Sequence, residues 1–296
     1  MKKHNHGKRY PFQAADFVLL VILTLVTLSV LIPFINVVAI SFTSYREYLT
    51  STFVLWPKQP TLSAYKELFK DSRILIGYKT TIVYVLIGVP LNLLLECSLA
   101  YALSRKGWVG RKALLFFVLV TMVFNGGIVP TYLVMKSLGL TNTIWSVIFG
   151  NACNTFNMIL IYNYFGTMPE ALSESASLDG ASEWTIMFRI ILPLAKPILA
   201  TVTLFTAVGL WNEYFMSMIF IRSNVWQPLQ LVLRSIVMDS QVMDTTKSAS
   251  IALEGRNFTE GIKTAAVMAT MLPIMCVYPF LQKYFTKGIM IGAIKA

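Results

Sequence analysis

The sequence predicts an all-α membrane protein that crosses the bilayer six times, and three observations support this fold class. Of its 296 residues, 56% are hydrophobic and 13% are charged, whereas a soluble domain carries nearer a quarter of charged residues. Its apolar residues gather in six runs of roughly 20 residues, the length that a helix needs to cross the hydrocarbon core. Its basic residues cluster in short segments between those runs, as in segments that orient a membrane protein.

The six apolar runs lie near residues 17–40, 78–103, 113–134, 143–165, 197–221 and 264–285. The first run is too long for the core of a signal peptide and lacks a small-x-small cleavage site, so we expect it to be retained as a span. The stretches between the runs leave no room for a soluble domain. We therefore predict a single transmembrane domain over residues 1–296.

The basic clusters predict the orientation of the chain. The N-terminal tail and the link over residues 105–112 hold four basic residues each and no acidic residue, which places both in the cytoplasm. The longer loops over residues 41–77 and 222–263 mix basic with acidic residues. Six spans then place both termini in the cytoplasm, and the C-terminal residues Lys283, Lys287 and Lys295 agree with this.

Charge and reactive residues argue against several other classes of protein. A net charge of +11 would suit nucleic-acid binding, but the basic residues form no stripe with aromatic residues on which bases could stack. Cys97, Cys153 and Cys276 lie inside apolar runs without a Cys-x-x-Cys spacing, so we expect neither a disulfide nor a metal site. Both histidines lie in the N-terminal tail, and we find no catalytic constellation. The sequence therefore does not predict an enzyme.

The polar segment between the fourth and fifth spans, residues 167–193, has clear local signals, and we call it the bracket. Thr167 and Glu170 have the spacing of a capping box, and Pro169 suits the first turn of a helix. We therefore expect a short helix over residues 168–178.

The rest of the bracket predicts a turn and a second helix. Asp179 and Gly180 should end the first helix, because glycine readily adopts the left-handed conformation at a helix C-terminus. Ser182 can cap a second helix, and Pro193 and Pro197 then lead into the fifth span. A rigid helix–turn–helix could pass the motion of a docked partner to the spans. The alternative is an amphipathic connector that lies on the membrane interface.

The bracket also resembles a family signature. Glu174-Ser175-Ala176, then Gly180, then Ile190-Ile191-Leu192-Pro193 is similar to the "EAA" motif of permease subunits of binding-protein-dependent ABC importers. The usual form is Glu-Ala-Ala, three residues, Gly, about nine residues and Ile-x-Leu-Pro. Ser175 departs from that form, since the family usually has alanine there.

The resemblance extends over nearly the whole chain. The segment Trp211-Asn212-Glu213-Tyr214 is similar to a Trp-Asn-acidic-aromatic element of carbohydrate permeases. Residues 282–295 resemble the C-terminal tail of the maltose-type, oligosaccharide branch. Residues 124–132 resemble a subgroup of that branch, found in Gram-positive bacteria, whose members import complex or polysaccharide-derived oligosaccharides.

This resemblance implies a type I ABC importer permease fold in the bacterial cell membrane. The bracket would dock in a groove of a cytoplasmic ATPase subunit, present in two copies, which uses ATP and Mg²⁺. A second permease subunit would complete the pathway, and an extracytoplasmic solute-binding protein would deliver the oligosaccharide. The expected coupling residues are Glu170, Glu174, Ala176, Asp179, Gly180 and Pro193. The chain has no phosphate-binding Gly-x-x-x-x-Gly-Lys-Ser/Thr loop, so we expect no cofactor on this chain and ATP hydrolysis on another one.

Polar residues inside the expected spans are candidates for the sugar pathway, since such residues usually face the interior of a bundle. Asn151, Asn154 and Asn157 are spaced by three, so on one helix they would share a face. Trp211, Asn212, Glu213 and Tyr214 form the second candidate group. Hydrogen bonding between helices is the alternative role for these residues.

An ion-coupled secondary transporter is the main alternative function. It would need acidic residues or broken-helix ion sites at one depth of the membrane. Glu96 and Glu213 lie in different spans and at different expected depths, which argues against a carboxylate relay. A membrane scaffold with no transport role would leave the bracket unexplained.

Overall fold

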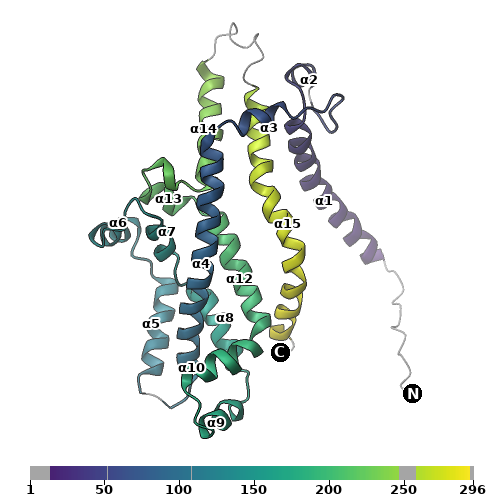
Figure 1. Cartoon of the computed structure of the whole chain (residues 1–296). Helices are drawn as coiled ribbons and strands as arrows, with labels where there is room; N and C mark the ends of the chain where they lie inside the picture. The colour runs from purple at the N-terminus through teal and green to yellow at the C-terminus, as the bar shows by residue number, and fades with distance from the viewer. Residues whose placement is uncertain (1–13, 52, 108, 247–257, 294–296) are drawn as a thin grey trace. The chain divides into compact units, whose positions relative to one another are not determined.

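A computed structural model describes residues 14–51, 53–107, 109–246 and 258–293, and its regular elements in those ranges are helices (Figure 1). This confirms the predicted all-α class. By length and composition, three of these helices can cross a membrane, or up to six spans form if each of three bent helix pairs is one span. The basic N-terminal tail and Lys295 lie outside the described residues, so the orientation of the termini stays a prediction.

The chain divides into two compact units, and the first comprises residues 1–68 and 244–268. Its long helix α1 (Ala14–Ser41) exposes apolar side chains on all sides, as expected of a helix surrounded by lipid. The helix α2 (Tyr45–Thr50) packs Tyr45 and Tyr48 against the ring of Phe258, with ring centroids 5.8 and 5.0 Å apart. A third helix, α3 (Ser63–Leu68), ends this part of the chain.

The second unit comprises residues 69–243 and 269–296 and is built around α4 (Ser72–Ser104). The helices α8 (Thr155–Phe165) and α12 (Lys196–Trp211) pack along α4 (Figure 1). Small residues allow close contact: a Cβ atom on Gly77 would lie 3.0 Å from Cα of Leu229. This unit holds the bracket and both groups of candidate pathway residues.

Three predicted spans are interrupted in the structure. The third consists of α5 (Arg111–Val123) and α6 (Ile128–Ser137), which meet at 115°. The fourth consists of α7 (Ile144–Gly150) and α8, which meet at 47°. The fifth ends earlier than expected, because α12 stops at Trp211 and the shorter α13 (Phe215–Phe220) follows it.

The remaining elements are those of the bracket and those that follow α13 in the chain. The bracket contains α9 (Ala171–Leu178), α10 (Glu183–Ile186), the π-helix η1 (Met187–Ile191) and α11 (Leu192–Leu194). A 3₁₀ turn η2 (Asn224–Trp226), α14 (Leu229–Thr246) and α15 (Thr259–Ala293) follow α13.

Candidate functional site

The first helix of the bracket ends in a Schellman turn. Gly180 follows α9 with φ of 81°, in the left-handed region that glycine adopts without strain. The N–H of Ala181 donates to the carbonyl of Ala176 (2.9 Å), and the N–H of Gly180 donates to that of Ser177 (3.0 Å). These bonds satisfy carbonyls at the end of the helix that have no partner within it. The predicted helix end is therefore confirmed.

The start of α9 differs from the prediction. The hydroxyl of Thr167 donates to the carbonyl of Tyr164 (2.7 Å) and is used within the turn that leaves α8. Glu170 occupies the N-cap position, and the helix begins at Ala171. The predicted capping box is therefore wrong, because local turn geometry takes up the hydroxyl that the spacing assigned to the helix.

The second helix of the bracket continues into the fifth span through one sharp bend. The side chain of Ser182 accepts the N–H of Thr185 (3.3 Å), which confirms Ser182 as an N-cap. From α10 to α11 the chain stays helical, and it then bends by 86° into α12 at Ala195. Pro193 lies in α11, and Pro197 lies in the first turn of α12, where a missing N–H costs no hydrogen bond. The bracket is therefore joined to α12 by helical chain with one bend at Ala195.

Apolar side chains of the bracket pack into the core of the second unit. Ile186, Met187 and Ile191 are buried in one cluster with Tyr101 of α4 and Phe165 of α8. Such apolar burial stabilises by about 25 cal/mol per Å². The bracket is thus held against α4 and α8 as well as joined by the chain to α8 and α12.

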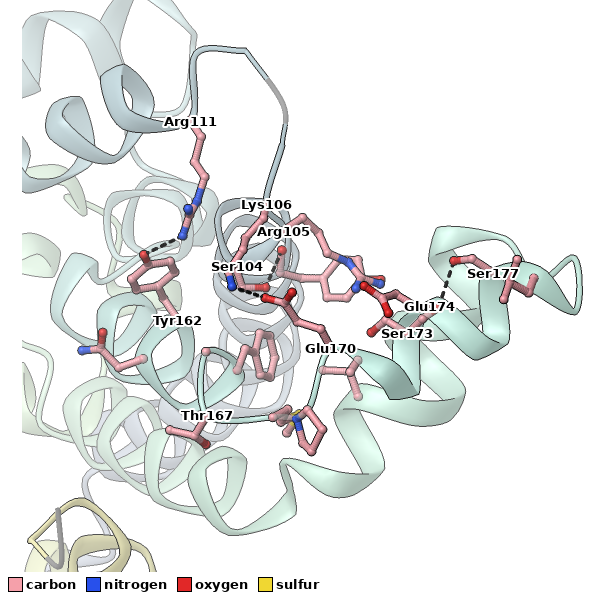
Figure 2. Close-up of a pocket in the computed structure, with 18 residues that line it drawn as sticks. Ser104, Arg105, Lys106, Arg111, Tyr162, Thr167, Glu170, Ser173, Glu174 and Ser177 are labelled. Atoms are coloured by element: carbon pink, nitrogen blue, oxygen red, sulfur yellow. Dashed lines mark hydrogen bonds and ion pairs between the residues drawn. The ribbon is translucent and has the colours of Figure 1, made fainter.

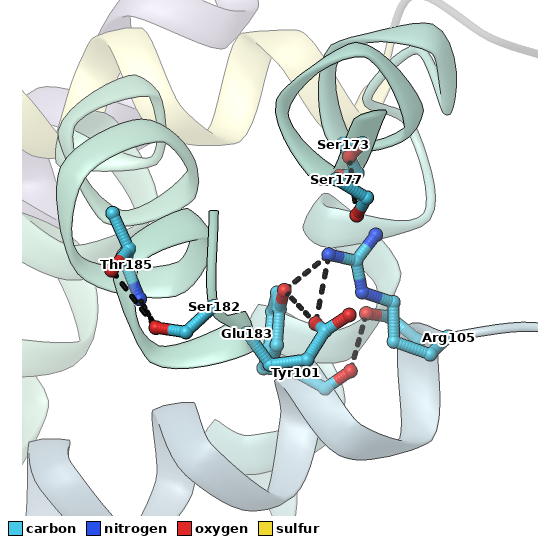
Figure 3. A network of polar contacts seen from close by, with 8 residues as sticks. Tyr101, Arg105, Ser173, Ser177, Ser182, Glu183 and Thr185 are labelled. Carbon is cyan, nitrogen blue, oxygen red and sulfur yellow. Dashed lines mark hydrogen bonds and ion pairs between the residues drawn. The ribbon is translucent and has the colours of Figure 1, made fainter. Parts of the chain in front are cut away.

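Polar contacts from α4 and the link after it also reach the bracket (Figure 3). The hydroxyl of Tyr101 donates to Oε2 of Glu183 (2.6 Å), and Nη2 of Arg105 lies 3.1 Å from the same oxygen. Arg105 also contacts the Tyr101 hydroxyl, and its guanidinium lies 4.6 Å from the centre of that ring. Lys106 pairs with Glu170 at 2.5 Å. The basic cluster predicted to orient the chain therefore also contacts both helices of the bracket.

A cavity of about 930 Å³ lies beside these contacts and is lined by residues of the bracket and of the ends of α4 and α8 (Figure 2). Its wall includes Arg105, Lys106 and Arg111 on one side and Glu170 and Glu174 on the other. The cavity therefore brings basic residues at the end of α4, in the link after it and at the start of α5 near acidic residues of the bracket.

The solvent-exposed residues of the bracket include acidic and large apolar side chains. Glu174 and Asp179 are exposed, and Leu178 beside them is 89% exposed. Trp184 is 63% exposed and stacks on Phe188, with ring centroids 6.0 Å apart. Exposed aromatic and apolar residues of this kind are typical of protein–protein contacts.

The three asparagines of the fourth span do not share one helix face. Asn151 ends α7 and donates to the carbonyl of Val147 (3.0 Å), while Asn154 caps α8 by accepting the N–H of Asn157 (3.2 Å). Asn157 is buried and donates to the hydroxyl of Thr206 on α12 (3.3 Å). The expectation of a shared face is wrong, because the helix breaks between the first two asparagines.

The second candidate group lies at the end of α12 and start of α13. The indole N–H of Trp211 donates to the carbonyl of Thr270 (3.2 Å), and Glu213 accepts the N–H of Met216 (2.7 Å). Asn212 is exposed and accepts a hydrogen bond from Gln230 (3.3 Å). Tyr214 is 41% exposed, with the guanidinium of Arg234 over its ring. In this group Asn212 and Tyr214 are accessible, whereas Trp211 and Glu213 hold the break together.

Sequence reasoning missed the structural role of Glu96. Its side chain is fully buried in α4, and Oε1 accepts the N–H of Asn154 (2.9 Å) at the break between α7 and α8. The second oxygen, Oε2, is buried without a hydrogen-bond partner in the described part of the chain. An acidic residue inside an apolar run was the available signal, but its partner could not be identified from the sequence.

Comparisons with known proteins agree on one family. Residues 80–291 match the family described as binding-protein-dependent transport system inner membrane component. Protein LplC of Bacillus subtilis (strain 168) is 41% identical over 268 residues, which cover 90% of this chain and 89% of that protein. The polygalacturonan/rhamnogalacturonan transport system permease protein YtcP of the same organism is 36% identical over 280 residues, covering 95% and 98%.

A solved structure agrees with these relatives. It is a crystal structure of a bacterial ABC transporter involved in the import of the acidic polysaccharide alginate, and one of its chains is 32% identical to this one. The match has a TM-score of 0.84 and covers 96% of this chain and 100% of that chain. The bracket and both candidate pathway groups fall within the region matched by the family.

Proposed function

Because the chain belongs to the family of inner-membrane components of binding-protein-dependent transport systems, we propose that it is the permease subunit of an ATP-driven importer of oligosaccharides. It translocates an oligosaccharide that an extracytoplasmic binding protein delivers. A second permease subunit completes the pathway, and two copies of a cytoplasmic ATPase subunit drive it with ATP and Mg²⁺. Both termini lie in the cytoplasm.

The shape of the bracket is the observation that carries this proposal. Its first helix, α9, exposes Glu174 and Leu178, whereas the helical stretch after the turn buries Ile186 and Ile191. Its second helix runs into α12 through a defined bend. A docked ATPase subunit could therefore transmit its movement to a span without the loss that a flexible linker would cause. Glu170, Ala176, Asp179, Gly180 and Pro193 complete this coupling segment.

The names of the relatives support the substrate class. One relative is named for the transport of polygalacturonan and rhamnogalacturonan, and the similar solved structure belongs to an importer of alginate. All of these are polysaccharides, so the proposed substrate is an oligosaccharide released from a polysaccharide. Asn212 and Tyr214, the accessible members of their group, are the proposed contacts of this chain with the sugar, with Asn151, Asn154, Asn157, Trp211 and Glu213 supporting the same pathway.

Reconstituted uptake tests the proposal. The chain is co-expressed with its second permease and ATPase, inserted into proteoliposomes, and supplied with the binding protein and radiolabelled oligosaccharides of polygalacturonan or alginate. We expect uptake that requires both hydrolysable ATP and the binding protein. Uptake that persists without ATP and follows an ion gradient would instead indicate a secondary transporter.

A single substitution tests the docking role. Glu174→Arg reverses a charge on the exposed face of α9 and should reduce co-purification of the ATPase subunit. Lys112→Glu, in the first turn of α5, is a control whose charge change has the same size and the opposite sign, and it should leave co-purification intact. Equal co-purification of both variants with the wild type would contradict docking at Glu174.

A further inference from the structure

A cluster of side chains joins the bracket to a helix that does not adjoin it in the sequence. We propose that Tyr101, Arg105 and Glu183, with the ion pair of Lys106 and Glu170, form a clamp through which movement of the bracket displaces α4. The inference rests on the proposed function, since it assigns a second transmission route to the same bracket.

The clamp holds the bracket at two points. Glu170 lies at the start of α9 and Glu183 at the start of α10, so each helix of the bracket has its own contact with the end of α4 or the link after it. Tyr101 is only 7% exposed, and its hydroxyl meets the same carboxylate oxygen as Arg105. Two points of attachment restrain both helices, so the bracket and the end of α4 should move together.

The helix α4 carries this movement toward the break in the fourth span. Glu96 lies on α4 about 13 Å from the level of Arg105, at 1.5 Å per residue. Its carboxylate accepts the N–H of Asn154 at that break, and Asn157 in the next turn donates to Thr206 of α12. A shift of α4 would therefore act on the break directly, in addition to the force that α12 receives from the bracket.

The pairs are suited to transmission rather than to stability. The side chain of Glu183 is 64% exposed and that of Lys106 is 72% exposed. Exposed ion pairs contribute little to folding free energy, so we expect variants of the clamp to fold and assemble. Their effect should appear in how much substrate moves for each ATP hydrolysed.

A charge swap in the complete transporter tests the clamp. Proteoliposomes with the binding protein and radiolabelled polygalacturonan oligosaccharides give uptake and phosphate release in the same sample. Arg105→Glu and Glu183→Arg should each lower the amount taken up per ATP by roughly threefold, with basal ATP hydrolysis unchanged. The double variant should restore the ratio. Lys112→Glu is the matched control, because Lys112 is exposed in the first turn of α5, just after that link, and should behave as the wild type.

The results distinguish a failure of the proposed transport function from a failure of the clamp. If the wild type shows no ATP-dependent uptake, the proposed function fails, and the ratio of binding-protein-stimulated to basal ATP hydrolysis then tests the clamp alone. If the wild type is active and Arg105→Glu matches Lys112→Glu, or the double variant is no better than the single ones, the clamp is wrong. Should Arg105→Glu fail to assemble, Tyr101→Phe removes one hydroxyl and retains the packing. An unchanged ratio in that variant overturns the proposal.

Discussion

The bracket and the breaks in the fourth and fifth spans both interrupt membrane helices with polar residues, yet they use those residues differently. In the bracket, Glu174 and Asp179 remain exposed and available to a partner. At the breaks, Asn154 and Glu213 accept backbone N–H groups and are used by the fold. A polar residue in an apolar run is therefore first a candidate for a helix break, and only those that stay accessible are candidates for binding a substrate.

The largest expected effect on stability comes from a substitution of Glu96 at the break in the fourth span. Glu96→Leu removes the acceptor from the partly buried hydrogen bond of the Asn154 N–H, which should cost about 1–3 kcal/mol of unfolding free energy. Glu96→Gln retains an acceptor oxygen of nearly the same shape and should cost less. Thermal unfolding of the purified complex compares the two. If Glu96→Leu is as stable as Glu96→Gln, the break does not depend on this contact.

The second largest expected effect on stability comes from a substitution of Gly180 in the turn of the bracket. Gly180→Ala places a side chain on a residue with φ of 81°, at a cost of about 1–2 kcal/mol. Gly209→Ala lies within α12 with open space around it and should instead stabilise by about 0.5–1 kcal/mol. Unfolding temperatures that move in opposite directions would support the assigned turn, and a common direction would contradict it.

Gly180→Leu extends this test from stability to function. A larger side chain at the same position should distort the turn and reduce co-purification of the ATPase subunit. Unchanged co-purification and uptake in this variant would show that docking does not require the observed turn.

The break after α12 should separate a packing role from a substrate role. Trp211→Phe loses one hydrogen bond to Thr270 and should lower stability by about 0.5–1.5 kcal/mol. Asn212→Leu changes an exposed group and should reduce uptake more than assembly. Uptake assays and size-exclusion profiles of both variants provide the comparison. Equal loss of assembly in both would indicate that the whole segment serves packing.

These differences show which parts of the molecule the sequence can predict. The Schellman turn at Gly180 and the cap at Ser182 depend on residues within one turn of each other, so local rules identified them. The break at Asn151 and the burial of Glu96 depend on helices far apart in the sequence. Spans predicted from runs of apolar residues do not reveal such breaks, because a bent helix pair and a straight helix have similar hydropathy. The capping box at Thr167 failed for a local reason, since the preceding turn uses the same hydroxyl.

The smallest expected effect concerns Asp71, the N-cap residue of α4, the helix that contacts both the bracket and the break in the fourth span. Hydrogen bonding from the side chain of Arg73 lowers the pKa of Asp71 from its ordinary value. The charged carboxylate therefore stabilises the fold when the pH is above the ordinary pKa of an aspartate. This contribution is lost as the pH falls through the lowered pKa of Asp71. Asp71→Asn should remove this small pH dependence from the unfolding temperature. An unchanged pH profile would exclude Asp71 as its source.

Cross-linking from an exposed position of the bracket tests directly whether the bracket is the docking site of the ATPase subunit. A photo-reactive phenylalanine analogue replaces Leu178, which is 89% exposed on the bracket, or Lys112, which is exposed in the first turn of α5. In membranes that contain the whole transporter, we expect position 178 to cross-link to the ATPase subunit and position 112 to cross-link to it much more weakly. The absence of any ATPase cross-link from position 178, or equal cross-linking from both positions, would contradict the claim that the bracket is the docking site.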